Sequence, residues 1–332
     1  MPQSCHHRSY SRMKRITESR IKCLLIGLIW LSIGMVSAVE VTTGTVVVEK
    51  EKNIKDLKKV GVPQYNISFV VEDGKIAVAE TKEHKGLFGT KATASAYARI
   101  EGLSPETMQA IVDLAYADFV SQLEAAGFEV DKDAYAKIQN QDYVKFHDGP
   151  ASDHSYYRAF NNKLHDVTVA PTGMNVLKTQ TNSLGLPADK FGLTLLNVEY
   201  LLHFGYFASE TKVEEATAIS GAKAEARVTL GQGIQVYWHS GISVINGLEN
   251  AFKKPNAKVM VEKNFYSTTP FGNTVRDNAS GGKEGLSGLF RAAIVGGKRY
   301  VITVEENEYT AAALAVIKKV NEALVKELAA NR

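Results

Sequence analysis

Cysteine is nearly missing from this 332-residue sequence. Its two copies, Cys5 and Cys23, both lie within the first 38 residues. The rest of the chain can therefore form no disulfide bond and can offer no cysteine nucleophile. Without disulfides, the fold must be held together by its apolar core, and a chain of this length can bury a sufficient one.

The first 38 residues have the layout of a secretory signal. Met13-Lys14-Arg15 begins a positive segment, residues 23–35 (CLLIGLIWLSIGM) are apolar, and Val36-Ser37-Ala38 supplies small residues for a signal peptidase. The apolar run is shorter than the ~20 residues that a bilayer-spanning helix needs. We therefore expect cleavage after Ala38, a true start at Met13 and a periplasmic or secreted location, with an uncleaved anchor helix as the alternative.

An excess of basic charge is also missing once this leader is set aside. The whole sequence has 39 Lys and Arg and 36 Asp and Glu, but six of the bases and one of the acids lie in residues 1–38. The remainder has 33 basic and 35 acidic side chains, a net charge of −2. The clustered Lys and Arg of a nucleic-acid-binding surface are missing, so we expect no nucleic-acid partner.

Motifs for catalysis are missing as well. The nearest match to a Gly-x-Ser-x-Gly nucleophile elbow, Gly285-Leu286-Ser287-Gly288, fails at its last position. Gly231 and Gly233 fall within an expected strand, where they indicate a bulge or a close backbone approach and not a phosphate loop. His203 lies in an apolar strand and is expected to be a hydrogen-bonded core histidine. We expect no cofactor and favour a protein that does not catalyse.

One polar stretch keeps an enzymatic alternative open. Residues 147–166 contain several His and Asp side chains, which are the donors that a zinc-type ion prefers. Their spacing matches no established metal motif. The candidate ligands are His147, Asp153, His154 and His165, and the alternative function is a metal-dependent or serine hydrolase that uses this stretch.

Helical periodicity is clearest between Ser104 and Val130. Ser104 suits the N-cap position, Pro105 suits the first turn, and Gly127 supplies a left-handed stop before an extended run. A second long helix is predicted over residues 309–328 from its apolar stripe. Shorter helices are expected at 49–59, 131–140 and 190–196.

Apolar and alternating segments predict a sheet. Residues 199–209 and 223–238 are expected to be two long neighbouring strands joined by a polar loop at 210–221. Asp73-Gly74 predicts a hairpin turn between strands 66–71 and 75–79. Residues 141–165 and 265–285 are expected to be long irregular loops. The fold class is therefore α/β: a single large domain with a mixed sheet flanked by helices, with long loops. Its expected organisation is a signal at 1–38, an extended N-terminal arm at 39–63 and the α/β domain at 64–332.

Aromatic side chains are frequent in the segments expected to be loops. Exposed rings on loops favour recognition of a partner such as a protein, a glycan or a lipid of the cell envelope. The alternative is that these rings pin long loops to the domain surface. The candidate binding residues are Tyr156, Tyr157, Phe160, Phe265, Tyr266 and Phe271.

The order of the expected elements resembles a known family. A strand at 75–79 (KIAVA), a loop, a long capped helix that ends in LEAAGFEV at 123–130, and the later strand pair resemble the periplasmic domain of curli-secretion outer-membrane proteins and TolB amino-terminal-like domains. The likeness covers about residues 75–240 and implies an envelope protein that assembles or recruits. The sequence departs from the curli-secretion pattern at Val39, where that family has a lipid-modified cysteine, and membrane-spanning hairpins are not evident. Pore formation is therefore not implied, and no functional residue is carried over.

The function expected from these observations is that of an exported periplasmic or envelope-associated protein that works by binding or assembly. A homo-oligomeric component of an outer-membrane secretion or surface-assembly system is a second expectation. The two expected loops, 141–185 and 263–285, would mark the binding site if they met on one concave face.

Overall fold

The computed structural model describes residues 39–81, 91–158, 162–178, 181–214, 223–247, 257–277 and 298–332. The side chains of 154–158, 162–164 and 181–182 are not part of this description. Residues Glu40–Arg332 form one compact unit, and the leader with its expected cleavage site lies outside the described residues. None of the helices in the described part is long and apolar enough to cross a membrane.

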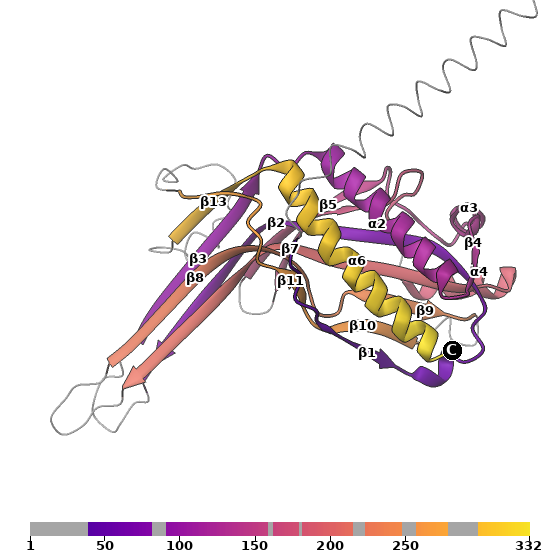
Figure 1. Ribbon diagram of the computed structural model, residues 1–332, viewed down its shortest axis with the longest axis horizontal. Coiled ribbons are helices and arrows are strands. Elements are labelled where there is room, and N and C mark those ends of the chain that lie inside the picture. The colour runs from indigo at the N-terminus through magenta and orange to yellow at the C-terminus, as the bar shows by residue number, and fades with distance from the viewer. Residues whose placement is uncertain are drawn as a thin grey trace, which may run out of the picture. The chain divides into compact units, whose positions relative to one another are not determined.

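The unit is built around one mixed sheet of 13 strands (Figure 1). Its main path runs β1-β10-β9-β7-β2-β3-β13-β12. The central pair, β2 and β7, is parallel, as is β3 with β13, and most other neighbours are antiparallel. The strands are β1 (Thr45–Glu49), β2 (Lys59–Glu80), β3 (Lys91–Glu101), β4 (Glu129–Asp131), β5 (Ala151–Arg158), β6 (Asn162–Val169), β7 (Thr194–Glu214), β8 (Lys223–Val236), β9 (Gly241–Ile245), β10 (Ala257–Lys263), β11 (Phe265–Ser267), β12 (Gly272–Arg276) and β13 (Lys298–Val304).

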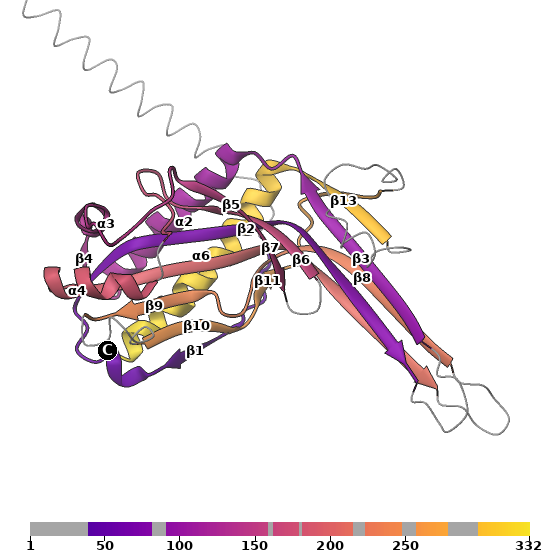
Figure 2. The same cartoon turned by 180° about the vertical axis from the view of Figure 1, so that it is seen from behind.

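Two long helices, α2 (Pro105–Ala125) and α6 (Glu306–Ala330), lie side by side on one face of the sheet (Figures 1 and 2). Their N-termini are tied together, because the Glu306 carboxylate accepts hydrogen bonds from the Ser104 backbone and hydroxyl and from the Thr107 hydroxyl. These bonds hold the pKa of Glu306 below its usual value. The shorter elements are α3 (Ala134–Gln139), α4 (Gly185–Phe191) and the 3₁₀ turns η1 (Glu51–Asn53) and η2 (Thr181–Leu184).

A buried polar network joins these helices to the central strands. Asn321 on α6 is fully buried, and its Oδ1 accepts hydrogen bonds from Tyr65 of β2 and Tyr200 of β7. Its Nδ2 donates to the Ala115 carbonyl and to Asp118 on α2. One side chain thus connects two strands and two helices at the centre of an otherwise apolar core.

The helix predictions are confirmed for the long elements. Ser104 caps α2 by accepting a hydrogen bond of 3.2 Å from the Thr107 N–H, and Gly127 adopts the left-handed conformation with φ 82°. The closing helix and the short helix in 131–140 are also found. The helix expected over 190–196 is wrong in its second half, because α4 ends at Phe191 and β7 begins at Thr194. The helix expected at 49–59 is reduced to the single turn η1.

The hairpin turn predicted at Asp73-Gly74 is wrong, because β2 runs without interruption from Lys59 to Glu80. The Asp73 carboxylate instead accepts a hydrogen bond from the Gly74 N–H and contacts His203. Gly74 lies close to the Tyr97 ring of β3. The two residues are therefore used for close packing within a strand. The boundary expected between residues 63 and 64 also falls inside β2, and β1 pairs with β10.

Within the described residues, much of the sequence expected to be loop is strand. Residues 210–214 continue β7, residues 151–158 form β5, residues 162–165 begin β6, and residues 265–267 and 272–276 form β11 and β12. Residues 210–214 have the polarity of a loop because they lie in an exposed strand and not in a core strand. The observed class is α/β, with more strand than helix.

Candidate functional site

The most distinctive feature is a pair of long hairpins that runs past the part of the sheet covered by the helices (Figures 1 and 2). We define this hairpin pair as residues 73–80 of β2, 91–95 of β3, 203–214 of β7 and 223–233 of β8. The first hairpin is formed by β2 with β3 and the second by β7 with β8. The neighbouring strands predicted at 199–209 and 223–238 are confirmed as β7 and β8, although β7 continues to Glu214 through residues expected to be a loop. The first hairpin was not predicted, because Asp73-Gly74 was interpreted as a turn.

The central strands β2 and β7 separate where the hairpin pair begins. They are paired as far as Phe69 and Leu202. Beyond that point β2 pairs with β3 and β7 pairs with β8. Within the described residues, the outer parts of β2 and β7 have one strand partner each, so each presents one free edge. A long free edge is a template for pairing with another strand.

The two hairpins are held together by small residues. Ala77, Ala96 and Val228 form a buried cluster between them, and Phe207 and Tyr300 pack against it. Contacts join β3 to β8, while the outer part of β7 remains exposed. Alanine side chains allow the two layers to approach closely, but they bury little apolar area, so this contact is weaker than the main core.

The exposed face of the second hairpin carries a ladder of opposite charges. Across the two strands, Glu210 faces Arg227, Lys212 faces Glu225 and Glu214 faces Lys223. Lys212 also contacts Glu214 at 2.8 Å, and this hydrogen bond raises the pKa of the lysine and lowers that of the glutamate. Opposite charges directly across a strand pair favour one register over its alternatives.

Glycines mark the inner end of the second hairpin, as the sequence predicts. A side chain at Gly231 would collide with the Tyr206 ring, which covers it from the opposite strand. A side chain at Gly233 would collide with the Ser267 carbonyl of β11. The register of β7 and β8 also shifts between His203 and Gly205. The prediction of a bulge or close backbone approach at these glycines is confirmed.

A buried His–Asp pair lies where the two hairpins diverge. His203 Nε2 is 2.7 Å from Asp73 Oδ2, and both side chains are buried. The other imidazole nitrogen accepts a hydrogen bond of 3.2 Å from the Gly205 N–H. The prediction of a satisfied core histidine is confirmed. Its partner was missed, because Asp73 followed by glycine looked like a turn.

The predicted metal ligands are only partly brought together. His165 Nε2 is 2.6 Å from Asp153 Oδ1, and its Nδ1 is 4.0 Å from Glu72. The His147 backbone N–H donates a hydrogen bond to the Val176 carbonyl. Among the side chains that the structure describes, no three His, Cys, Asp or Glu groups are placed to hold a metal ion. The side chain of His154 lies outside the description, so the four-residue prediction stays a prediction.

The candidate aromatic residues divide into two groups. Phe265 and Phe271 are fully buried, and Phe271 packs edge-on against Tyr309 at 5.1 Å, so the expectation of exposed rings is wrong for these two. They pack inward because β11 and β12 belong to the sheet. Tyr266 is 39% exposed. The side chains of Tyr156, Tyr157 and Phe160 lie outside the described residues.

A tryptophan outside the candidate set is more exposed. Trp238 is 54% exposed, and its ring lies tilted against that of His239, whose φ of 69° is unusual for a residue with a side chain. The Trp238 backbone N–H donates a hydrogen bond of 2.8 Å to Asn264 Oδ1. A Trp-His dipeptide at the end of a predicted strand was the available signal.

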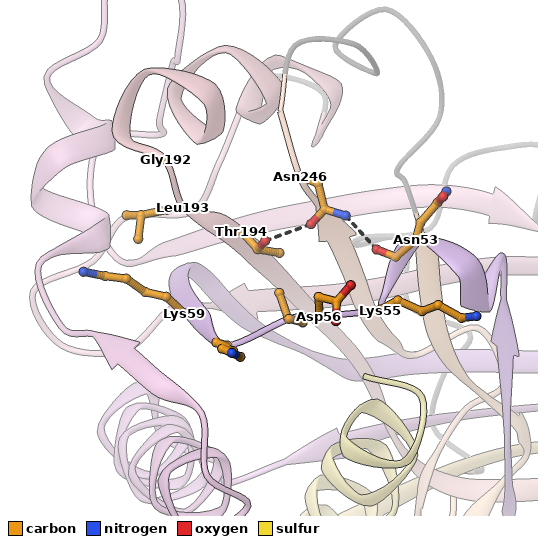
Figure 3. Close-up of a pocket in the computed structure, with 10 residues that line it drawn as sticks. Asn53, Lys55, Asp56, Lys59, Gly192, Leu193, Thr194 and Asn246 are labelled. Carbon is orange, nitrogen blue, oxygen red and sulfur yellow. Dashed lines mark hydrogen bonds between the residues drawn. The ribbon is translucent and has the colours of Figure 1, made fainter.

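A pocket of about 310 Å³ lies at the opposite end of β2 and β7, near η1. Its polar wall is organised by Asn246, which accepts from Thr194 and donates to the Asn53 carbonyl. Figure 3 shows Lys55 and Lys59 extending in opposite directions, with Asp56 between them. Lys59 contacts Glu129 at 3.2 Å. Lys58 also lines the pocket, so three lysines and one aspartate give its lining an excess of positive charge, although Lys55 and Lys59 do not converge on a common point.

The described site thus offers unpaired strand edges and packed hairpin surfaces, together with one buried His–Asp pair. Within the described residues, both expected loop regions contribute strands to the sheet, since β6 pairs with β2 and β11 pairs with β8. No protein-family model, curated protein or solved structure matches this chain.

Proposed function

We propose that this protein is an exported, envelope-associated assembly protein that acts by binding and not by catalysis. In this proposal, the free strand edges of the hairpin pair accept a strand from a second copy of the chain. The resemblance to envelope proteins that assemble or recruit is compatible with such a role, and the leader-like first 38 residues would place the protein in that compartment.

The observation that carries the proposal is the separation of β2 and β7 beyond Phe69 and Leu202. Among the described residues it leaves one unpaired edge along 73–80 of β2 and one along 203–214 of β7. Natural proteins usually protect such edges by charged side chains, by bulges, by short strands or by a covering element. Val78 and Val213 are 48% and 41% exposed on these two strands, so apolar surface accompanies the free backbone groups.

A second copy is the favoured partner because the same chain carries both free edges and a patterned charge ladder. The signs alternate along β7 at Glu210, Lys212 and Glu214. An identical ladder on another copy can meet it with opposite charges aligned after a shift of two residues. A closed set of such contacts would give a homo-oligomer.

The hydrolase alternative has less support. Both side chains of the His203–Asp73 pair are buried, and His165 contacts Asp153 and lies 4.0 Å from Glu72. A catalytic base needs to reach a substrate. No observation on the described side chains of residues 147–166 favours this alternative over a structural role.

The proposal is tested by measuring the mass of the processed protein in solution by native mass spectrometry and light scattering. We expect a concentration-dependent oligomer. Val78→Lys and Val213→Lys place a charge on the free-edge strands and should reduce association at least tenfold. Leu114→Lys is the matched control, because Leu114 is 52% exposed but lies on α2.

A strict monomer at all accessible concentrations would overturn the proposal. Equal weakening by Leu114→Lys would also overturn it, because the effect would then reflect added charge and not the strand edges. Circular dichroism of each variant confirms that the fold is retained, since all three positions are exposed.

A further inference from the structure

The buried His203–Asp73 pair spans the point where the two hairpins part. Asp73 faces Ala98 of β3, while His203 faces Gln235 of β8. Because β2 and β7 no longer pair with each other here, the contact between these side chains is a direct link between the hairpins. Its length of 2.7 Å is that of a good hydrogen bond.

The hydrogen bonds around the pair define its protonation state. Asp73 Oδ1 accepts from the Gly74 N–H at 2.7 Å, and Oδ2 accepts from His203 Nε2. His203 Nδ1 accepts from the Gly205 N–H at 3.2 Å. A nitrogen that accepts a hydrogen bond carries no proton, so this network assigns a neutral imidazole with its proton on Nε2.

The surroundings leave the Asp73 charge buried. The rings next to His203 are Phe204 at 4.9 Å, Tyr237 at 5.2 Å and Phe207 at 6.5 Å, and none of them is charged. Ala98 and Gln235 face the pair from β3 and β8 without charge, and half-buried Lys75 follows two residues beyond Asp73 on β2. Burying a carboxylate beside a neutral partner is costly, whereas an imidazolium would neutralise it.

Two arrangements therefore compete at one nitrogen. In the first, Nδ1 accepts from Gly205 and the pair has a net negative charge. In the second, Nδ1 carries a proton, the pair is a neutral ion pair, and the Gly205 N–H loses its acceptor. Gly205 lies at the register shift between β7 and β8, where the strand pairing is already interrupted.

We propose that His203 and Asp73 form a proton-sensitive latch, in which proton uptake at His203 Nδ1 breaks the bond from Gly205 and loosens the root of the second hairpin. Imidazole is the side chain suited to such a change near neutral pH. The latch itself is a property of one chain. Its consequence, an acid-dependent change in the pairing of the free edges, rests on the proposed function.

The latch is tested by amide hydrogen exchange at Gly205, corrected for the intrinsic pH dependence of exchange, in the full processed protein. Loss of one hydrogen bond of about 1–1.5 kcal/mol corresponds to roughly tenfold faster exchange. We expect this acceleration between pH 7.5 and pH 5 in the wild-type protein. His203→Gln keeps a donor for Asp73 but cannot take up a proton, and it should change less than twofold.

His165→Gln is the matched control, because His165 contacts Asp153 near the same end of the hairpins but does not touch Gly205. It should retain the wild-type response. An unchanged Gly205 amide in the wild-type protein, or an equal response in folded His203→Gln, would overturn the latch. If His203→Gln fails to fold, the wild-type ring nitrogen signals decide, because Nδ1 of His203 must gain a proton as Gly205 exchange accelerates.

The experiment separates this proposal from the proposed function. Exchange at Gly205 is measured at concentrations where the chain is monomeric, so it does not depend on assembly. A titrating latch in a protein that never associates would support the latch and contradict the assembly role. A concentration-dependent oligomer with a silent Gly205 amide would do the reverse.

Discussion

At the scale of single residues, the structure concentrates its polar groups where strands meet helices or separate from each other. Asn321 satisfies two tyrosine hydroxyls and two acceptors on α2. Tyr309 differs, because its hydroxyl is buried without a hydrogen-bond partner in the described structure. The same kind of group therefore stabilises the fold at one position and costs free energy at another.

Asn321→Ala is expected to lower the free energy of unfolding by about 2–4 kcal/mol, because it removes the acceptor that the buried Tyr65 and Tyr200 hydroxyls share. Urea unfolding followed by circular dichroism measures the change. Asn331→Ala, near the exposed end of the same helix, is the control and should cost less than about 1 kcal/mol. Equal costs for both variants would contradict the role of the network.

Tyr309→Phe is expected to raise stability by about 1 kcal/mol, because it removes a buried hydroxyl that has no partner. Burial also raises the pKa of Tyr309 above the usual value of a phenol. The folded protein therefore holds the Tyr309 phenol neutral. Below pH ~10 this has no effect on the pH dependence of stability, but as pH rises further the free energy of unfolding falls by about 1.4 kcal/mol per pH unit.

Urea unfolding between pH 8 and pH 11 tests both parts of this expectation. The variant should be more stable at pH 8 and should lose stability less steeply above pH ~10 than the wild-type protein. Tyr65 and Tyr200 have raised pKa values for the same reason, so a part of the alkaline slope remains in Tyr309→Phe. A destabilised variant at pH 8 would show that the hydroxyl has a partner.

At the scale of elements, the hairpin pair is a weakly packed extension of a well-packed body. The contact between the hairpins uses mainly alanine, whereas the contact between the helices and the sheet contains large buried rings such as Tyr65 and Phe119. The glycines at the root of the second hairpin allow β8 to contact both β7 and β11. Substitution of each glycine therefore tests a different contact, either with β11 at the root of the hairpin or with the exposed Tyr206 ring on its surface.

Gly233→Ala is expected to cost about 1–3 kcal/mol, because the new methyl group would meet the Ser267 carbonyl and push β11 from β8. Gly231→Ala meets only the Tyr206 ring, which is 45% exposed and can move away, so it should cost less than about 1 kcal/mol. Chemical unfolding of the two variants measures this order. A larger cost for Gly231→Ala than for Gly233→Ala would contradict the close approach of β11 to Gly233.

The elements that follow one periodic rule were predictable, and those that depend on a distant partner were not. Helix α2 has its cap, its stripe and its stop within its own residues, so the prediction succeeded. Asp73-Gly74 has the local form of a turn, but its carboxylate bonds His203 from another strand. The local pattern of the exposed β7 end also resembles a loop, because neither of its faces is buried in the core.

The candidate site shows the same division. Burial of His203 was predictable from its apolar strand, but the partner and the separation of β2 from β7 were not. Phe265 in β11 and Phe271, which directly precedes β12, looked like exposed loop residues, because glycine, proline and threonine lie nearby in the sequence. Only the pairing of β11 with β8 and of β12 with β13 turns these rings into the core.

At the scale of the whole molecule, one sheet contributes both the well-packed body and the hairpin pair that we propose for assembly. The described body buries a large apolar core between the sheet and the two long helices. Among the described residues, the unpaired edges of the hairpin pair leave backbone groups and apolar side chains exposed. We therefore expect a protein that folds as one chain and then associates through its hairpins.

Disulfide cross-linking of single-cysteine variants of residues 39–332 tests this claim most directly, because this part of the sequence has no cysteine of its own. Val78→Cys and Val213→Cys, alone and mixed, should form intermolecular disulfides under mild oxidation, while Leu114→Cys should remain monomeric. The products are read on a non-reducing gel and by mass spectrometry. Cross-linking of Leu114→Cys as fast as the hairpin variants, or none in any variant, would contradict assembly through the free edges.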